Sequence, residues 1–385
     1  MASAWRASLS TLDRYTVVQD LQASLPEDKR DDAISIEQEA FQNSSSRDEY
    51  DAALRQAASR ATPRPPVARE RPDTSQAGIT IGSYPDCEPV AQGVTSEVFR
   101  SASTSHALKV IITAHGNLEP HNPQREASIL TELHKLQPPP ERIVRLITTF
   151  RDQESRFVLV FPYLPLTLHA VLSRTASALP AAHVASIFAD VLNALAFIHG
   201  RGMLHRDVKP SAILLESPSG PAYLSDFGTA WHPRLSACTE PSSSKILDIG
   251  TGAYRAPEVL FANKAYGAPV DMWATGVMLA ESITSPPKPP FASRPAHEDG
   301  NQLGLILSII KTLGTPTEET WPEAKAFKVS PFELWTVFPR RTWDEILPDA
   351  HAEFRDLVAK LVCFESGDRM TAEEALNHGC FTNRD

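Results

Sequence analysis

The 385-residue sequence has few cysteines and no long apolar run, and both absences narrow the kind of protein that it encodes. The four cysteines, Cys87, Cys238, Cys363 and Cys380, are far apart and form no CxxC pair. This argues against a disulfide scaffold or a zinc site and predicts reduced thiols inside a cell. No run of 18 apolar residues occurs and the N-terminus has no apolar stretch. We therefore expect neither membrane spanning nor secretion, and place the protein in the nucleus or cytoplasm.

Basic residues are also in the minority, with 37 Lys and Arg against 47 Asp and Glu and a net charge of −10. This balance argues against a nucleic-acid-binding protein that is held by bulk attraction to phosphates. Hydrophobic content of 42% and charged content of 22% are ordinary for a globular protein. The length allows one large two-lobed domain with an appendage, or two or three small domains.

Residues 1–78 differ in texture from the rest of the chain. They are charged and sparsely apolar, and Pro63, Pro65 and Pro66 break any helix in the linker-like stretch ATPRPPVARERPDTSQAG. Apolar residues between positions 12 and 25 could line one face of a short helix that packs on the main domain. The composition favours the other interpretation, a partly disordered N-terminal extension.

From residue 79 the pattern changes to short β-branched and aromatic runs, which predict a strand-rich small lobe with a hinge over 79–164. One helical pattern, PQREASILTELHKL, lies between the third and fourth runs. Helical patterns then dominate residues 165–381. A β-rich lobe followed by a helical lobe predicts an α+β fold over 79–381, with a cleft between the lobes.

Three ordered motifs lie in the second lobe. HRDVKP contains Asp207 and Lys209, DFG begins at Asp226, and APE ends at Glu258. Together they are the signature of eukaryotic protein kinases, and residues 79–381 resemble that family. The resemblance implies a two-lobed kinase fold and the transfer of phosphate from ATP to a protein hydroxyl.

The resemblance assigns a role to each of these side chains. Phosphoryl transfer requires a protein to orient a hydroxyl and to neutralise charge on phosphates. Asp207 would accept or orient the hydroxyl proton of the substrate, Lys209 would steady the γ-phosphate, and Asp226 would bind the Mg²⁺ that bridges phosphate oxygens. A lysine two positions after the aspartate resembles the serine/threonine class.

The small lobe should supply the remaining ATP contacts. HALKVII resembles the third-strand motif whose lysine, here Lys109, holds the α- and β-phosphates, and REASIL places its partner Glu126 on the following helix. In AQGVTSEV only Gly93 survives of the three expected glycines, since Ala91 and Ser96 occupy the other two positions. This predicts a stiffer hairpin over the phosphates.

The adenine pocket is implied by FVLVFPYL, which resembles the last strand before a kinase hinge. Phe161 would be the gatekeeper, and Val98 and Ala107 would also contact ATP. In the hinge, Pro162 offers only a carbonyl, whereas Leu164 offers both a carbonyl and an N–H.

The resemblance also implies structural roles in the large lobe. Asp271 would anchor the catalytic loop from a central helix, and Glu258 would form a buried ion pair with Arg369. Arg206 and Thr251 would belong to the activation-segment machinery, with Thr251 in the loop that follows the activation loop.

The phrases YRAPEVLF and IIKTLGTPTEETWP resemble the cyclin-dependent-kinase group. Three departures narrow that resemblance. The sequence before Glu126 lacks the PSTAIRE-like motif that docks a cyclin. Of the three arginines that bind a phosphorylated activation loop, only Arg125 and Arg206 are present. Trp231 stands at the third position, and Ile246 stands where the phosphothreonine is expected.

A group member with these departures resembles the single-subunit CDK-activating kinases of fungi. That resemblance implies a cyclin-dependent kinase as the protein substrate, no required cyclin, and a monomer. Another cyclin-independent member of the group is the alternative. Without a phosphate acceptor at Ile246, either Asp248 or Glu240 would supply a fixed negative charge to Arg206 and Arg125.

Ala212 occupies the position of the metal-binding asparagine, five residues after Asp207. Alanine has no side-chain oxygen for the second Mg²⁺. Two functions from different classes therefore stay open: an active kinase with a weakened site that needs more Mg²⁺ or prefers Mn²⁺, and a pseudokinase that binds nucleotide or acts as a scaffold. The presence of Lys109, Glu126 and Asp226 favours the enzyme.

Overall fold

The computed structural model describes residues 78–93, 95–112, 119–292, 302–333 and 336–382, and scattered positions between 40 and 54. The chain divides into two compact units, residues 1–76 and residues 77–385. In the first unit the described residues around Tyr50 are helical. The hypothesis of a helix between residues 12 and 25 lies outside the described residues. All elements below belong to the second unit.

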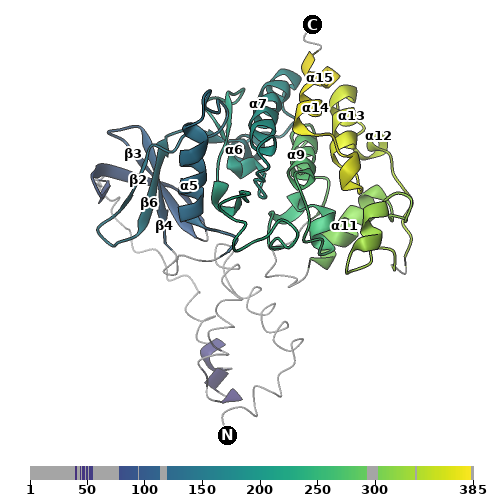
Figure 1. Cartoon of the computed structure of the whole chain (residues 1–385), viewed down its shortest axis with the longest axis horizontal. Coiled ribbons are helices and arrows are strands. Elements are labelled where there is room, and N and C mark those ends of the chain that lie inside the picture. Colours follow the sequence, from purple (N-terminus) through teal and green to yellow (C-terminus); the bar gives the residue numbers. More distant parts are fainter. Residues whose placement is uncertain are drawn as a thin grey trace, which may run out of the picture. The chain divides into compact units, whose positions relative to one another are not determined.

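The small lobe is a six-stranded antiparallel sheet with strand order β1-β2-β3-β4-β6-β5 (Figure 1). Side chains that alternate along the strands bury one compact cluster, which contains Phe99, Leu108 and Val160. The strands are β1 (Ile79–Ile81), β2 (Tyr84–Gln92), β3 (Ser96–Ser101), β4 (His106–Ile111), β5 (Thr148–Arg151) and β6 (Phe157–Pro162).

Helix α5 (Pro123–His134) is inserted between β4 and β5. Its first turn is capped by the side chain of Asn122, which accepts a hydrogen bond from the N–H of Arg125 at 2.9 Å. Ile129, Leu130 and Leu133 are buried at the helical spacing that the sequence shows. The cap and this apolar stripe fix the face that α5 turns toward the protein.

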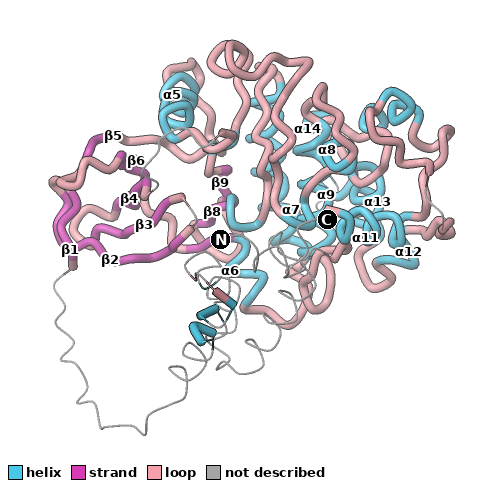
Figure 2. The backbone as a smooth tube through the Cα atoms, turned by 90° about the horizontal axis from the view of Figure 1, so that it is seen from below, coloured by secondary structure: helices cyan, strands magenta, loops and turns pink. Residues whose placement is uncertain are grey.

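The large lobe begins with a three-stranded sheet, β7-β8-β9, and is otherwise helical (Figure 2). Its centre is α9, in which every residue from Val270 to Ser282 is buried. The elements are β7 (Leu166–Thr167), α6 (Leu168–Ser173), α7 (Ala181–His199), β8 (Ile213–Leu215), β9 (Ala222–Leu224), α8 (Pro257–Leu260), α9 (Pro269–Ser282), α11 (Leu303–Leu313), α12 (Trp343–Ile346), α13 (Ala352–Leu361), α14 (Ala372–Leu376) and α15 (Gly379–Thr382).

Helix α7 is long and apolar enough to cross a membrane if only length and composition are considered. Core helices of globular proteins pass the same test. In this structure Ile187, Leu192 and Ile198 are fully buried within the large lobe. The apolar character of α7 is therefore explained by packing.

Strands end at Pro162 in the small lobe, and helices dominate from Leu168 onward. Figure 2 shows the strands of the first part gathered at one end of this unit and the helices at the other. The predicted α+β, two-lobed fold is confirmed.

Candidate active site

The catalytic loop is held in place by one buried carboxylate, Asp271 of α9. Its two oxygens accept hydrogen bonds from the backbone N–H groups of His205 at 2.8 Å and Arg206 at 2.7 Å, and from the ring of His199 at 2.8 Å. Burial alone would raise the pKa of Asp271, but the hydrogen bond and charge of His199 bring that pKa below its usual value. Asp271 therefore stays ionised and fixes the loop.

His205 links this loop to the DFG segment. Its Nε2–H donates to the carbonyl of Ser225 at 2.8 Å, and its ring meets Phe227 edge-on with centroids 4.9 Å apart. His205 and Phe227 are fully buried. This histidine packs against the core and is not placed to exchange protons with a substrate.

Asp207, Lys209 and Thr251 form a connected group at the end of the catalytic loop. The Nζ of Lys209 donates to Asp207 Oδ2 at 2.6 Å and to Thr251 Oγ1 at 2.9 Å. The hydroxyl of Thr251 in turn donates to Asp207 Oδ1 at 2.6 Å. The carboxylate is thus oriented by donors from two segments, which is the arrangement that a residue positioning a hydroxyl requires.

Lys109 of β4 lies between two carboxylates that come from different elements. Its Nζ is 2.9 Å from Glu126 Oε2 on α5 and 2.8 Å from Asp226 Oδ1. Burial alone would lower the pKa of Lys109, but both carboxylates raise it above its usual value. The charge of Lys109 also lowers the pKa of Asp226. The site therefore contains a fixed cation beside an ionised Asp226, as phosphate and metal binding require.

Asp226 has the left-handed backbone conformation, with φ of 61°, and 42% of its side chain is exposed. Among the described residues, no side chain hydrogen-bonds its Oδ2. Mg²⁺ in phosphate sites is commonly held by one or two carboxylates together with phosphate oxygens and waters. The donor chemistry at Asp226 therefore fits a divalent ion bound with a nucleotide.

The hairpin between β2 and β3 keeps a tight turn with only one glycine. The N–H of Gly93 donates to the carbonyl of Ser96 at 2.8 Å, and Ala91 pairs with Val98 across the two strands. A Cβ at position 93 would lie 3.3 Å from the Ser96 carbonyl oxygen. This close approach accounts for the glycine at 93, whereas the other two expected glycine positions carry the small side chains of Ala91 and Ser96.

Adjacent strands carry the residues predicted to surround the adenine. Val98 on β3 is the register partner of Lys109 on β4, and Ala107 on β4 is the partner of Phe161 on β6. Phe161 is buried near the end of β6, which ends at Pro162, the first of the predicted hinge residues. The structure therefore brings this set onto the same sheet as Lys109.

Two comparisons with known proteins bear on this constellation. A family model described as the protein kinase domain matches residues 84–381. This chain belongs to the protein kinase family. The serine/threonine-protein kinase csk1 of Schizosaccharomyces pombe is 32% identical over 294 residues, which cover 73% of this chain and 89% of that protein. The chain is a protein serine/threonine kinase that uses ATP and a divalent metal ion.

The kinase departs from its family at Ala212, which is buried in the turn Pro210–Ala212. The carbonyl of Ala212 accepts two hydrogen bonds from Ser225, from its N–H at 2.9 Å and its hydroxyl at 2.8 Å. Ser225 is thus engaged away from any metal. Among the described residues, no group of three or more His, Cys, Asp or Glu side chains is arranged to hold a metal ion. The side chain at position 212 therefore offers no oxygen ligand, and the nearby Ser225 hydroxyl is engaged by the backbone.

The predicted ion pair of the large lobe is present. Arg369 donates to Glu258 through both ends of its guanidinium, at 2.7 and 2.8 Å, and both side chains are almost fully buried. Arg369 also donates to the backbone carbonyl of Cys363 at 2.9 Å. The pair joins the APE motif to the segment between α13 and α14.

Of the two acids proposed to serve Arg206, only Glu240 contacts it. Arg206 Nη1 and Glu240 Oε1 form an ion pair with side-chain exposures of 0% and 1%. Asp248 lies on the surface with 84% of its side chain exposed, and its nearest cation is Arg255 at 3.5 Å. The alternative that Asp248 serves Arg206 is wrong, because its side chain is directed to solvent.

The prediction that the same acid also reaches Arg125 is wrong as well. Arg125 Nη1 pairs with Glu119 Oε2 at 2.9 Å, and its Nη2 donates to the carbonyl of Pro120. Side chains of a helix lean toward its N-terminus, and Glu119 stands just before α5. Arg125 is therefore neutralised locally.

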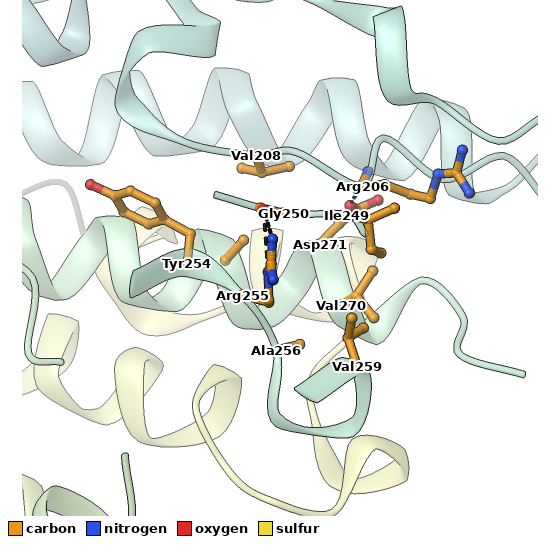
Figure 3. Close-up of a pocket in the computed structure, with 11 residues that line it drawn as sticks. Arg206, Val208, Ile249, Gly250, Tyr254, Arg255, Ala256, Val259, Val270 and Asp271 are labelled. Atoms are coloured by element: carbon orange, nitrogen blue, oxygen red, sulfur yellow. Dashed lines mark hydrogen bonds between the residues drawn. The ribbon is translucent and has the colours of Figure 1, made fainter. Parts of the chain in front are cut away.

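Sequence reasoning also missed the backbone geometry beside Thr251. Gly250 has φ of 74°, and its carbonyl accepts hydrogen bonds from Arg255 Nη2 at 3.0 Å and Nε at 3.3 Å (Figure 3). Gly250 and Arg255 help to line a small pocket between the catalytic loop and α9, and in the same view the guanidinium of Arg206 points away from it. The glycines on both sides of Thr251 were the available signal, because a positive φ favours glycine.

Proposed function

We propose that this kinase is a CDK-activating kinase, which phosphorylates the activation loop of a cyclin-dependent kinase as a single chain. The observation that carries the proposal is the buried ion pair of Glu240 with Arg206, which would hold the activation segment without a phosphate. The resemblance of TEPSSSKILDIGTGAYRAPEVLF to the fungal enzymes supports the substrate class. The protein would act as a monomer in the nucleus or cytoplasm.

The roles of the side chains follow from their contacts. Asp207 accepts the bonds of Lys209 and Thr251 and would orient the substrate hydroxyl. Lys109 would hold the nucleotide phosphates, with Glu126 fixing its position. Mg²⁺, or Mn²⁺ in its place, would neutralise charge on the phosphates when bound beside Asp226.

Cyclin independence is supported by the sequence before Glu126, which lacks the cyclin-docking motif. The exposed side chains within α5 are Gln124, Ser128 and Thr131.

Contacts within the chain position α5 instead. At its N-terminal end, the N–H of Asn122 donates to the carbonyl of Gly228 at 2.9 Å. Toward its C-terminal end, Arg234 of the activation segment donates to Glu132 at 2.8 Å. One end of the helix contacts the DFG motif and the other contacts Arg234, so Glu126 would reach Lys109 without a second protein.

The test is a transfer assay with purified full-length chain, labelled ATP and Mg²⁺, and no cyclin. One substrate is a catalytically inactive cyclin-dependent kinase, and the matched control carries alanine in place of its activation-loop threonine. We expect label on the first substrate and none on the second. Equal labelling of the two, or labelling of only a general substrate such as myelin basic protein, would reject the CDK-activating role.

A further inference from the structure

Glu240 occupies the centre of a buried group in the activation segment. Its carboxylate pairs with Arg206 and also accepts the N–H of Ile246 at 2.7 Å. Its backbone carbonyl accepts the indole N–H of Trp231 at 2.9 Å. Glu240 is therefore held at its backbone by Trp231 while its side chain holds two other parts of the kinase.

Tyr266 completes the attachment of Ile246. Its hydroxyl accepts a hydrogen bond from Arg206 Nη1 at 3.1 Å and donates to the carbonyl of Ile246 at 2.6 Å. Burial raises the pKa of Tyr266 to about 12, so the hydroxyl keeps its proton. Both backbone groups of Ile246 are thus fixed, at the position where related kinases carry phosphothreonine.

Lys245 fills the space beside Trp231. Its Nζ lies 5.2 Å from the centre of the Trp231 ring and 5.1 Å from that of Tyr266. It also donates to the carbonyl of Tyr266 at 2.7 Å. The aromatic faces stabilise the buried ammonium by cation–π attraction. An arginine at position 231 would instead bring a further cation into this group.

The charges explain why a tryptophan stands at position 231. A phosphothreonine carries a charge of about −1.5 to −2 and can balance several arginines, whereas a carboxylate carries −1. Glu240 already faces Arg206, and Lys245 lies nearby. Arg206 and Lys245 already bring two cations to this single carboxylate, and an arginine at position 231 would add a third. Trp231 provides an N–H donor without adding charge.

Arg206 links Glu240 to the catalytic residue Asp207. Its backbone N–H is held by Asp271, its Nε donates to the carbonyl of Thr229, and the next residue is Asp207. Arg206 therefore connects Glu240 to two other parts of the site. Its main chain leads to the catalytic carboxylate of Asp207, and its guanidinium binds Thr229, which follows DFG.

We propose that Glu240 and Trp231 are positioning residues for phosphoryl transfer. Glu240 takes the place of an activation-loop phosphate, and Trp231 fixes Glu240 where an arginine would otherwise be needed. The inference deepens the proposed function, because it rests on activity that needs no activation-loop phosphate. The permanent carboxylate of Glu240 binds both the guanidinium of Arg206 and the backbone N–H of Ile246.

The test compares three variants of the full chain with the wild type. Glu240→Gln keeps the acceptor for Ile246 and removes the charge. Glu240→Asp keeps the charge on a shorter side chain. Trp231→Phe keeps an aromatic face for Lys245 and removes the indole N–H. Asp248→Asn is the matched control, because it removes an exposed acid of the same segment.

We expect Glu240→Gln to lower kcat/KM for a protein substrate about tenfold or more, since a charge-assisted hydrogen bond is lost. Trp231→Phe should lower it less, and Glu240→Asp should retain more activity than Glu240→Gln. KM for ATP should stay within about twofold in every variant, and Asp248→Asn should change kcat/KM by no more than about twofold.

Titration of nucleotide-binding sites separates positioning from folding. A purely structural role would remove binding sites in proportion to activity, whereas the positioning role leaves their number unchanged. Full activity of Glu240→Gln, a loss that equals its loss of binding sites, or greater activity of Glu240→Gln than of Glu240→Asp would each overturn the inference.

The assay uses myelin basic protein, so that it does not depend on the CDK-activating role. Phosphatase treatment of the wild type is run in parallel. Inactivation by phosphatase would overturn the proposed phosphate independence, whereas an unimpaired Glu240→Gln variant would overturn the role of Glu240. The two failures are therefore distinguishable.

Discussion

The kinase lacks a family residue in two regions, and the two regions handle the loss differently. In the catalytic loop Ala212 stands where the family has a metal-binding asparagine, its side chain has no oxygen, and the nearby Ser225 hydroxyl is bound to the Ala212 carbonyl. In the activation segment Ile246 stands where the family has a phosphate acceptor. Glu240, six positions earlier in the chain, pairs with Arg206, the arginine that such a phosphate would bind. A charge can be supplied by a long side chain from another position, whereas a metal ligand must stand at a fixed distance and direction.

The comparison is meaningful only if the rest of the catalytic loop works. Asp207→Asn removes the carboxylate that orients the substrate hydroxyl and should lower turnover at least about a thousandfold. Nucleotide binding should persist, because Lys109 and Asp226 are untouched. Transfer of labelled phosphate measures the first effect and ATP-induced thermal stabilisation the second. Equal turnover in the variant and the wild type would contradict the assignment.

The buried pair of Glu258 and Arg369 serves as a reference for the two regions that lack a family residue, because both of its family residues are present. Glu258→Ala should lower the free energy of unfolding by about 3–5 kcal/mol, because Arg369 is left buried without its partner. Denaturant titration measures this change. The control is the double variant Glu258→Leu with Arg369→Met, which removes both charges and should cost less. A single variant as stable as the wild type would contradict this reading.

Ala212→Asn sharpens the comparison by restoring the absent ligand. It should raise the rate about tenfold or more, or lower the Mg²⁺ requirement, since one ligand stabilises charge by about 1–2 kcal/mol. Rates over a range of Mg²⁺ and Mn²⁺ concentrations measure the effect, and Mn²⁺ should favour the wild type more than the variant. A wild type that is inert with every metal, beside an active variant, would favour a scaffold role for the natural protein.

The smallest effect is expected in the activation segment, where Glu240 supplies the charge that a phosphate would carry. Phosphatase treatment of the purified chain, and omission of any cyclin, should each change its activity by less than about twofold. The matched control is a phosphorylated cyclin-dependent kinase, which the same phosphatase should inactivate. A large loss in this chain, or a strict requirement for a cyclin, would show that Glu240 does not suffice.

The sequence predicted the parts of the site that come from contiguous motifs and regular elements. The contact of Lys109 with Glu126, the anchoring by Asp271 and the pair of Glu258 with Arg369 all join residues of recognisable segments. The two-lobed fold followed from strand and helix periodicity. The contacts were implied by the resemblance of these motifs to protein kinases, and only the order of strands and helices came from local periodicity.

The activation segment was only partly predictable, because it is irregular and its contacts have no period. Glu240 and Asp248 were equivalent as acids in the sequence, and only burial distinguishes them. The preference of Arg125 for Glu119 depends on the direction in which a side chain leaves a helix. The position of Lys245 between two rings required the three-dimensional arrangement of residues far apart in the chain.

A carboxylate cannot be hydrolysed from a protein as a phosphate ester can. If the activation segment is ordered by Glu240 and α5 by its own chain, as proposed, the kinase has no chemical off-state that a phosphatase could restore and would not respond to the periodic destruction of a cyclin. Its output in a cell would then follow the number of molecules made and degraded and the accessibility of their substrates. Such an enzyme supplies a constant background activity, and the timing of the response has to be set by the proteins on which it acts.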